Sequence, residues 1–146
     1  MAYADEQLLS LVLWRENRGG GYNGMQSVAN AISNRVANNK SSFYAECVKP
    51  LQFSSLTAKG DPELTLWPSV TDKTWIVAQG IASDAVAGKL TDLTHGATLY
   101  YAPHSIQTDQ TITLPNGSVI PFPKPWNKAH VEYTVTIADQ VFFKEV

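Results

Sequence analysis

Glu16 combines a chemically useful side chain with an unusual position in the sequence. From Asp5 to Glu16 apolar residues recur at the spacing of one helical face, and Glu16 continues that row. The run Gly19–Gly21 predicts that this helix ends directly afterwards. Burial and the negative end of a helix dipole both disfavour a charged carboxylate and so raise its pKa, as a general acid near neutral pH requires. Helix geometry alone equally allows Glu16 to turn toward solvent or to pair with Arg18.

Glycoside cleavage is the first chemistry that such a carboxylate could perform. Conventional glycosidases place two carboxylates across the scissile bond. The second could come from a loop, but nothing in the sequence singles out one of Asp61, Glu63, Asp92 and Asp109. A lone acid suffices where the substrate carries its own nucleophile, as when the C6 hydroxyl of N-acetylmuramic acid attacks its own C1. Aromatic side chains that could pack on sugar rings are Trp14, Trp67, Trp75, Trp126, Tyr100 and Tyr101.

Two other interpretations remain open at this point. Cys47 and His95 could serve a thiol peptidase or amidase. However, no cationic neighbour or helix N-terminus is evident to lower the pKa of Cys47, and lone cysteines are usually buried apolar residues. A non-catalytic carbohydrate-binding module would explain the aromatic residues, but it leaves a carboxylate on an apolar helical face unexplained.

Composition narrows the range of partners. A net charge of −2 and a pI near 5.8 argue against a nucleic-acid partner. No apolar run approaches the roughly 20 residues that span a bilayer, so we expect no membrane insertion. One cysteine and three histidines without metal-ligand spacing predict a protein without metal or other cofactor.

The first 90 residues have helical patterns and the remainder has strand patterns. Helical spacing predicts three helices, at residues 5–16, 25–36 and 71–87. A short apolar turn at 43–48 and a long loop at 51–70 separate the second helix from the third, and Gly88 is the expected C-cap of the third.

Strand signals begin at residue 97. We expect a strand at 97–101, a hairpin whose strands (111–114 and 118–122) flank the Asn116-Gly117 turn, and a last strand from Val131 that leads into 141–143. The chain is therefore predicted to be one α+β domain over residues 1–146.

Several motifs, taken in order, resemble the SleB-type cell wall hydrolases. That family opens with a Glu-Ala-Arg-Gly motif and a helix ending in Asn-Arg-Val. The matching segments are Glu16-Asn17-Arg18-Gly19, Gly24, Ser27 to Val36, Gln52-Phe53-Ser54, Val77 to Gly88, Thr94 to Tyr101, Trp126 and Thr136 to Phe143. Their order and spacing together are fairly specific, and they cover nearly the whole chain.

This resemblance implies a lysozyme-like α+β fold and cleavage of the MurNAc–GlcNAc bond of bacterial peptidoglycan, by a lytic transglycosylase or by a hydrolytic muramidase. The family's catalytic glutamate corresponds to Glu16. Strand alternation allows one of the paired tyrosines to face the cleft, and we prefer Tyr100 as the catalytic one. The expected substrate-binding residues are Gln52, Ser54, Tyr101 and Trp126. Arg18 is expected to brace the loop after the helix by hydrogen bonds to carbonyls.

The sequence also departs from the family pattern. Gly20 stands where the family often has a second acid, Gln140 replaces a histidine, and Ala138 replaces a glycine. The hairpin around Asn116-Gly117 resembles an insertion. It either shapes one end of the groove or decorates the surface, and its polarity favours decoration.

The sequence shows no leader or separate binding module. The absence of both leads us to expect a phage endolysin, which is made in the host cytoplasm and released to the cell wall. We expect a monomer whose partner is the glycan strand of peptidoglycan.

Overall fold

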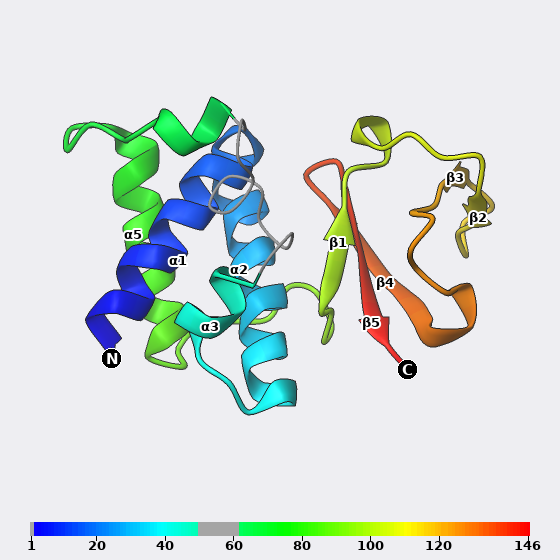
Figure 1. Cartoon of the computed structure of the whole chain (residues 1–146), viewed down its shortest axis with the longest axis horizontal. Coiled ribbons are helices and arrows are strands. Elements are labelled where there is room, and N and C mark those ends of the chain that lie inside the picture. The colour runs from blue at the N-terminus through cyan, green and yellow to red at the C-terminus, as the bar shows by residue number, and fades with distance from the viewer. Residues whose placement is uncertain (1, 50–61) are drawn as a thin grey trace.

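The computed structural model describes residues 2–49 and 62–146, and it divides into a helical half and a strand-rich half (Figure 1). The helices are α1 (Ala2–Asn17), α2 (Gly21–Asn39), α3 (Phe43–Cys47) and α5 (Lys73–Val86). The strands are β1 (Leu99–Tyr101), β2 (Thr111–Thr113), β3 (Val119–Pro121), β4 (Val131–Ile137) and β5 (Gln140–Glu145). Short 3₁₀ turns lie at Arg18–Gly20, Pro62–Thr65, Pro103–Ser105 and Lys128–His130. The predicted α+β class is confirmed.

The helical half is built around the apolar face of α1. Leu9, Val12 and Leu13 are fully buried, and α1 packs on α5, α3 and α2. The third predicted helix is observed with Asp72 as its N-cap, whose carboxylate accepts hydrogen bonds from the first-turn amides. Gly88, at φ 72°, closes its C-terminal end in a Schellman motif. In the part of the chain that the structure describes, no helix is long and apolar enough to cross a membrane.

The polar face of α2 holds the segment that enters the strand-rich half. The amides of Gln26 and Asn30 donate to the carbonyl of Thr91, at 2.8 and 3.0 Å. Farther along the helix, Asn34 donates to the carbonyl of Ala97 and Arg35 donates to that of Thr98. Buried carbonyls need such partners, so this row of side chains sets where β1 begins.

The strand-rich half contains two antiparallel sheets. β5 lies in the middle of a three-stranded sheet of order β1-β5-β4, and β2 pairs with β3 in the predicted hairpin. The expected last strand is in fact two strands, β4 and β5, which are joined by a tight turn at Ala138 and Asp139. Both turn residues have positive φ, 49° and 64°. Because neither is glycine or asparagine, the usual sequence signal of a hairpin turn is missing here.

Candidate active site

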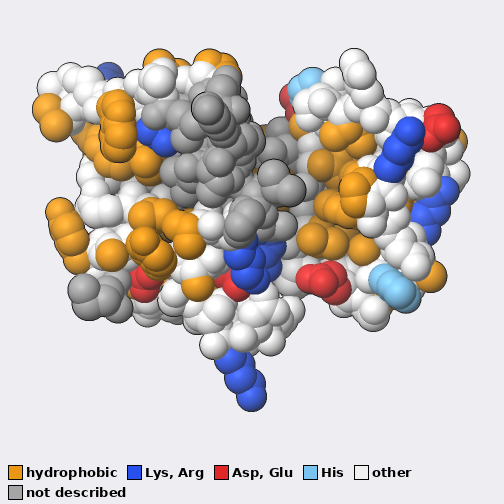
Figure 2. All heavy atoms as spheres, viewed as in Figure 1, with side chains coloured by type: hydrophobic (Ala, Val, Ile, Leu, Met, Phe, Trp, Pro, Cys, Tyr) orange, Lys and Arg blue, Asp and Glu red, His pale blue; other side chains and the backbone are white. Residues whose placement is uncertain are grey.

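A groove runs between the helical and strand-rich halves. Two adjoining cavities of about 500 and 460 Å³ share Glu16, Ala102 and Gln140. The first extends toward Trp126 and Arg35, and the second toward the turns at Gly19–Gly20 and Ala138–Asp139. The space-filling view shows the surface hollowed between the two halves (Figure 2). Glu16 therefore lies at the junction of the two cavities.

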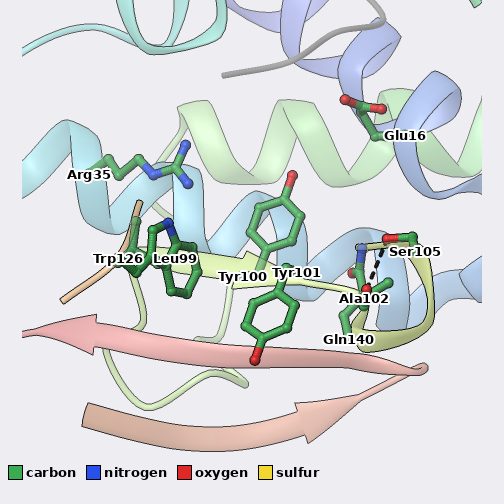
Figure 3. Close-up of a pocket in the computed structure, with 9 residues that line it drawn as sticks. All are labelled: Glu16, Arg35, Leu99, Tyr100, Tyr101, Ala102, Ser105, Trp126 and Gln140. Carbon is green, nitrogen blue, oxygen red and sulfur yellow. Dashed lines mark hydrogen bonds between the residues drawn. The ribbon is translucent and has the colours of Figure 1, made fainter. Parts of the chain in front are cut away.

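Glu16 is half-buried in the last turn of α1, and it lines the groove across from β1 (Figure 3). The neighbouring Arg18 forms an ion pair with Glu63, and its guanidinium stacks over the Trp14 ring at 4.3 Å. It also donates to the carbonyl of Trp14 at 3.0 Å. Arg18 thus braces the last turn of α1 through a carbonyl, where the sequence analysis expected it to brace the loop that follows, while Glu16 faces the groove.

The paired tyrosines point to opposite sides of β1, as strand alternation requires (Figure 3). The Tyr100 hydroxyl is directed toward the helical half and Glu16. The Tyr101 ring is buried in the apolar core of the strand-rich half, where it stacks on Phe143, and its hydroxyl donates to the carbonyl of Pro121 at 2.6 Å. Tyr101 lines the first cavity, and its ring also packs in the core of the strand-rich half. Its contact with substrate stays a prediction.

Tyr100 has a distinctive electrostatic environment. Burial raises the pKa of its phenol, the Arg35 guanidinium partly opposes this, and the Glu16 carboxylate raises the pKa further. Arg35 lies 6.0 Å from the centre of the Tyr100 ring and lines the same cavity. The hydroxyl consequently remains protonated at neutral pH and is able to donate a hydrogen bond beside Glu16.

Of the other expected substrate contacts, the structure describes Trp126 alone. Trp126 lines the first cavity and is half-buried, with edge-to-face contacts to Phe122 and Phe143 that hold its ring. Gln52 and Ser54 lie outside the described residues.

The loop carboxylates Glu63, Asp92 and Asp109, considered above as second acids, are not among the residues that line the two cavities. Glu63 pairs with Arg18, and Asp109 is 85% exposed beside Lys124. Burial opposes ionisation of Asp92, but hydrogen bonds from Thr94, Asn34 and Gly96 outweigh it and hold its pKa below the usual range. Asp61 lies outside the described residues. The structure instead brings Asp139, which the sequence did not single out, to the second cavity with Glu16.

The groove also contains polar groups to which the sequence analysis gave no role in the site. The amide of Asn17 donates to the side-chain oxygen of Gln140 at 3.2 Å, which ties the end of α1 to the start of β5. Gln140 occupies the position of the family's histidine, so that departure lies directly in the groove. Arg35, Ser105 and His104 also line it. The signal for Arg35 in the sequence was its place in the Asn-Arg-Val motif near the end of the second helix.

The Cys47 and His95 pair has no features of a thiol active site. Cys47 is fully buried in the helical core, and burial raises its pKa to about 12. His95 is exposed in the turn before β1. A thiolate is the reactive form of cysteine, so this environment disfavours the peptidase interpretation. Across residues 2–49 and 62–146, no group of three or more His, Cys, Asp or Glu side chains is arranged to hold a metal ion.

Comparison with known proteins places this geometry in a family. The chain shares its fold with the catalytic domain of the germination-specific lytic transglycosylase SleB from Bacillus anthracis. The TM-score is 0.66 at 21% identity, over 97% of this chain and 94% of that one. A search of curated proteins found no match. The family model described as Cell Wall Hydrolase matches residues 19–143, starting just after Glu16. The chain therefore belongs to the cell wall hydrolase family.

Proposed function

We propose that this enzyme degrades peptidoglycan as a lytic transglycosylase, cleaving the MurNAc–GlcNAc bond and leaving a 1,6-anhydro-MurNAc end. Family membership supports peptidoglycan as the substrate. The observation that carries the mechanism is the place of Glu16, a carboxylate common to both cavities of the groove. Among the residues described as lining the first cavity, Glu16 is the one carboxylate.

The proposed reaction uses Glu16 twice. Its protonated carboxyl first gives a proton to the glycosidic oxygen, so that the bond to C1 of MurNAc breaks and the GlcNAc hydroxyl leaves. The C6 hydroxyl of the same MurNAc then attacks C1 and gives its proton to the Glu16 carboxylate. The new C6–O–C1 bond closes the anhydro ring, and Glu16 returns to its starting state without consuming water.

Tyr100 on β1 and Arg35 on α2 complete this site. The neutral Tyr100 hydroxyl is positioned to donate a hydrogen bond to a sugar oxygen beside the bond being broken (Figure 3). The Arg35 side chain donates to the carbonyl of Thr98 and so holds the backbone two residues before Tyr100. We propose that Trp126 packs on a sugar ring at the far end of the first cavity.

Mass analysis of digested sacculi tests this proposal. Internal attack leaves glycan ends that are lighter by one water than the reducing ends left by hydrolysis. We expect anhydro ends with the native enzyme and no soluble muropeptides with the Glu16→Gln variant. Reducing ends alone would exclude the transglycosylase mechanism, and muropeptide release by Glu16→Gln at the native rate would remove Glu16 from the chemistry.

Hydrolysis by a muramidase is the second candidate, because Asp139 shares the second cavity with Glu16. In that mechanism Asp139 would activate water or stabilise the sugar cation. Asp139→Asn separates the two candidates. The variant removes the charge while preserving the positive φ of 64°, which asparagine tolerates well. A transglycosylase should retain anhydro products with less than about a tenfold loss of rate, whereas loss of an essential second carboxylate should cost about a hundredfold or more.

A further inference from the structure

A third cavity adjoins the groove in the strand-rich half. It has a volume of about 560 Å³ and lies between the β2–β3 hairpin and β4. It shares His104 and Asp139 with the second cavity. Its described lining residues all lie between 103 and 141, whereas residues of both halves line the two groove cavities. The third cavity therefore adjoins the groove on its strand-rich side, and we call it the side branch of the groove.

The lining of this branch suits a short aliphatic peptide. Its apolar surface is mostly aliphatic and includes Ile120 and Val135, while Asn116 and Ser118 supply polar groups. The ring of Tyr133 also lines it, and the Tyr133 hydroxyl is hydrogen-bonded to Thr136 at 2.7 Å. Sugar rings favour broad aromatic faces, whereas small aliphatic side chains and peptide amides fit a surface of this kind.

The charge of the branch also indicates its occupant. Asp139 is the one carboxylate among its described lining residues, and they include neither lysine nor arginine. An amine is therefore favoured there over a carboxylate.

The hairpin presents alternate residues to this cavity. Ser118 and Ile120 line it, while Val119 between them is 63% exposed and is not part of its lining. The hairpin was expected to be a surface decoration because it is polar, but two of its polar residues, Asn116 and Ser118, line this cavity. This alternation also offers a matched pair of positions for substitution.

We propose that the third cavity binds the stem peptide of peptidoglycan, with its alanyl side chains against the aliphatic surface and the amine of its diamino acid near Asp139. The stem leaves the glycan strand at the lactyl group of MurNAc, so a side branch matches the covalent structure of the substrate. This inference rests on the proposed function. The hairpin would then make the enzyme prefer glycan strands that carry stems.

The experiment compares two substrates: glycan strands with intact stems, and the same strands after an amidase has removed them. Rates of glycan cleavage are measured on both for the native enzyme and for Ser118→Trp and Val119→Trp. We expect the native enzyme to prefer stem-bearing strands. Ser118→Trp should lower that preference by about tenfold, because the indole occupies the branch, while Val119→Trp should leave it unchanged. Thermal unfolding verifies that both variants are folded.

A chemical probe that needs no variant tests the role of the amine. Acetylation of the diamino-acid amines removes their charge, and we expect the native rate on stem-bearing strands to fall by about two- to fivefold. Equal native rates on both substrates would overturn the proposal, as would equal effects of the two tryptophan variants. An enzyme that cleaves neither substrate contradicts the proposed function instead, so the two failures are distinguishable.

Discussion

The two walls of the groove are positioned by different kinds of interaction. On the helical wall, Glu16 is placed by the period of a single helix, whose apolar face is buried against α5 and α2. On the opposite wall, Tyr100 is placed by strand pairing with Phe142 and by the hydrogen bonds that α2 makes to residues 91–98. Local periodicity is therefore enough to position Glu16, whereas the residues that face it depend on contacts between segments far apart in the sequence.

Substitution of Glu16, the proposed acid, should have the largest effect and tests the helical wall. Glu16→Gln keeps the size and helix propensity of the side chain but cannot donate the proton, so we expect a loss of about a hundred- to ten-thousandfold in muropeptide release. The midpoint of thermal unfolding should stay unchanged. Glu6→Gln, on the same helix and also half-buried, is the control and should retain full activity. A loss of less than tenfold in Glu16→Gln would show that Glu16 is not the general acid.

The two tyrosines test the opposite wall, because adjacent residues should give different losses. Tyr100→Phe should lower activity by about tenfold without changing stability, since it removes one hydrogen bond to the substrate. Tyr101→Phe should retain activity and lose about 1 kcal/mol of unfolding free energy, since the carbonyl of Pro121 loses its donor. Activity assays and denaturant unfolding of both variants provide the measurements, and the reverse pattern would contradict the assignment.

Gly24 tests how closely the two walls approach each other. A Cβ at this position would lie 2.9 Å from the Asn17 amide nitrogen and 3.2 Å from the Ala138 Cβ. We expect Gly24→Ala to cost about 1–3 kcal/mol, since α2 and the β4–β5 turn must separate. Gly80→Ala is the matched control, because it points into open space within α5 and should stabilise by about 0.5–1 kcal/mol. Equal stability changes in the two variants, measured by denaturant unfolding, would show that the approach is not tight.

A substitution in the β4–β5 turn should raise the stability of the fold, where Gly24→Ala should lower it. Ala138 has φ 49°, a left-handed conformation that costs an alanine about 1 kcal/mol or more. Ala138→Gly relieves that strain but adds freedom to the unfolded chain. We therefore expect a stabilisation below about 1 kcal/mol, seen as a small rise in the unfolding temperature. A fall would mean that the Ala138 methyl contributes more by packing than its conformation costs.

The smallest expected effect concerns the loop that joins the two halves. Because hydrogen bonds hold the folded-state pKa of Asp92 below the unfolded value of about 3.9, ionised Asp92 stabilises the fold above that pH. This contribution is lost as the pH falls through the folded-state pKa. Asp92→Asn should lower the unfolding temperature at pH 7 and make the decline on acidification shallower. Asp109→Asn, at a side chain that is 85% exposed, is the control and should do neither.

Particular residues show how far sequence-based prediction could reach. The α1, α2 and α5 helices were predicted because their periodic apolar residues are a local signal, and the Asn116-Gly117 turn was predicted because its geometry selects those residue types. The Ala138-Asp139 turn was missed because tertiary contacts hold residues that carry no turn signal. The same holds for Asp139, which reaches the groove by means of that turn.

By itself, the sequence determined the helical position of Glu16, the alternation that directs Tyr100 and Tyr101 to opposite faces, and the motifs of the cell wall hydrolase family. These depend on the helical and strand periods and on the order of motifs, all of which can be read locally. The tertiary structure decided which partners face Glu16, how Gln140 is tied to Asn17, and that the hairpin encloses a third cavity. Those outcomes depend on the docking of the two halves, whose buried polar contacts join residues more than 60 positions apart and leave no periodic trace in the sequence.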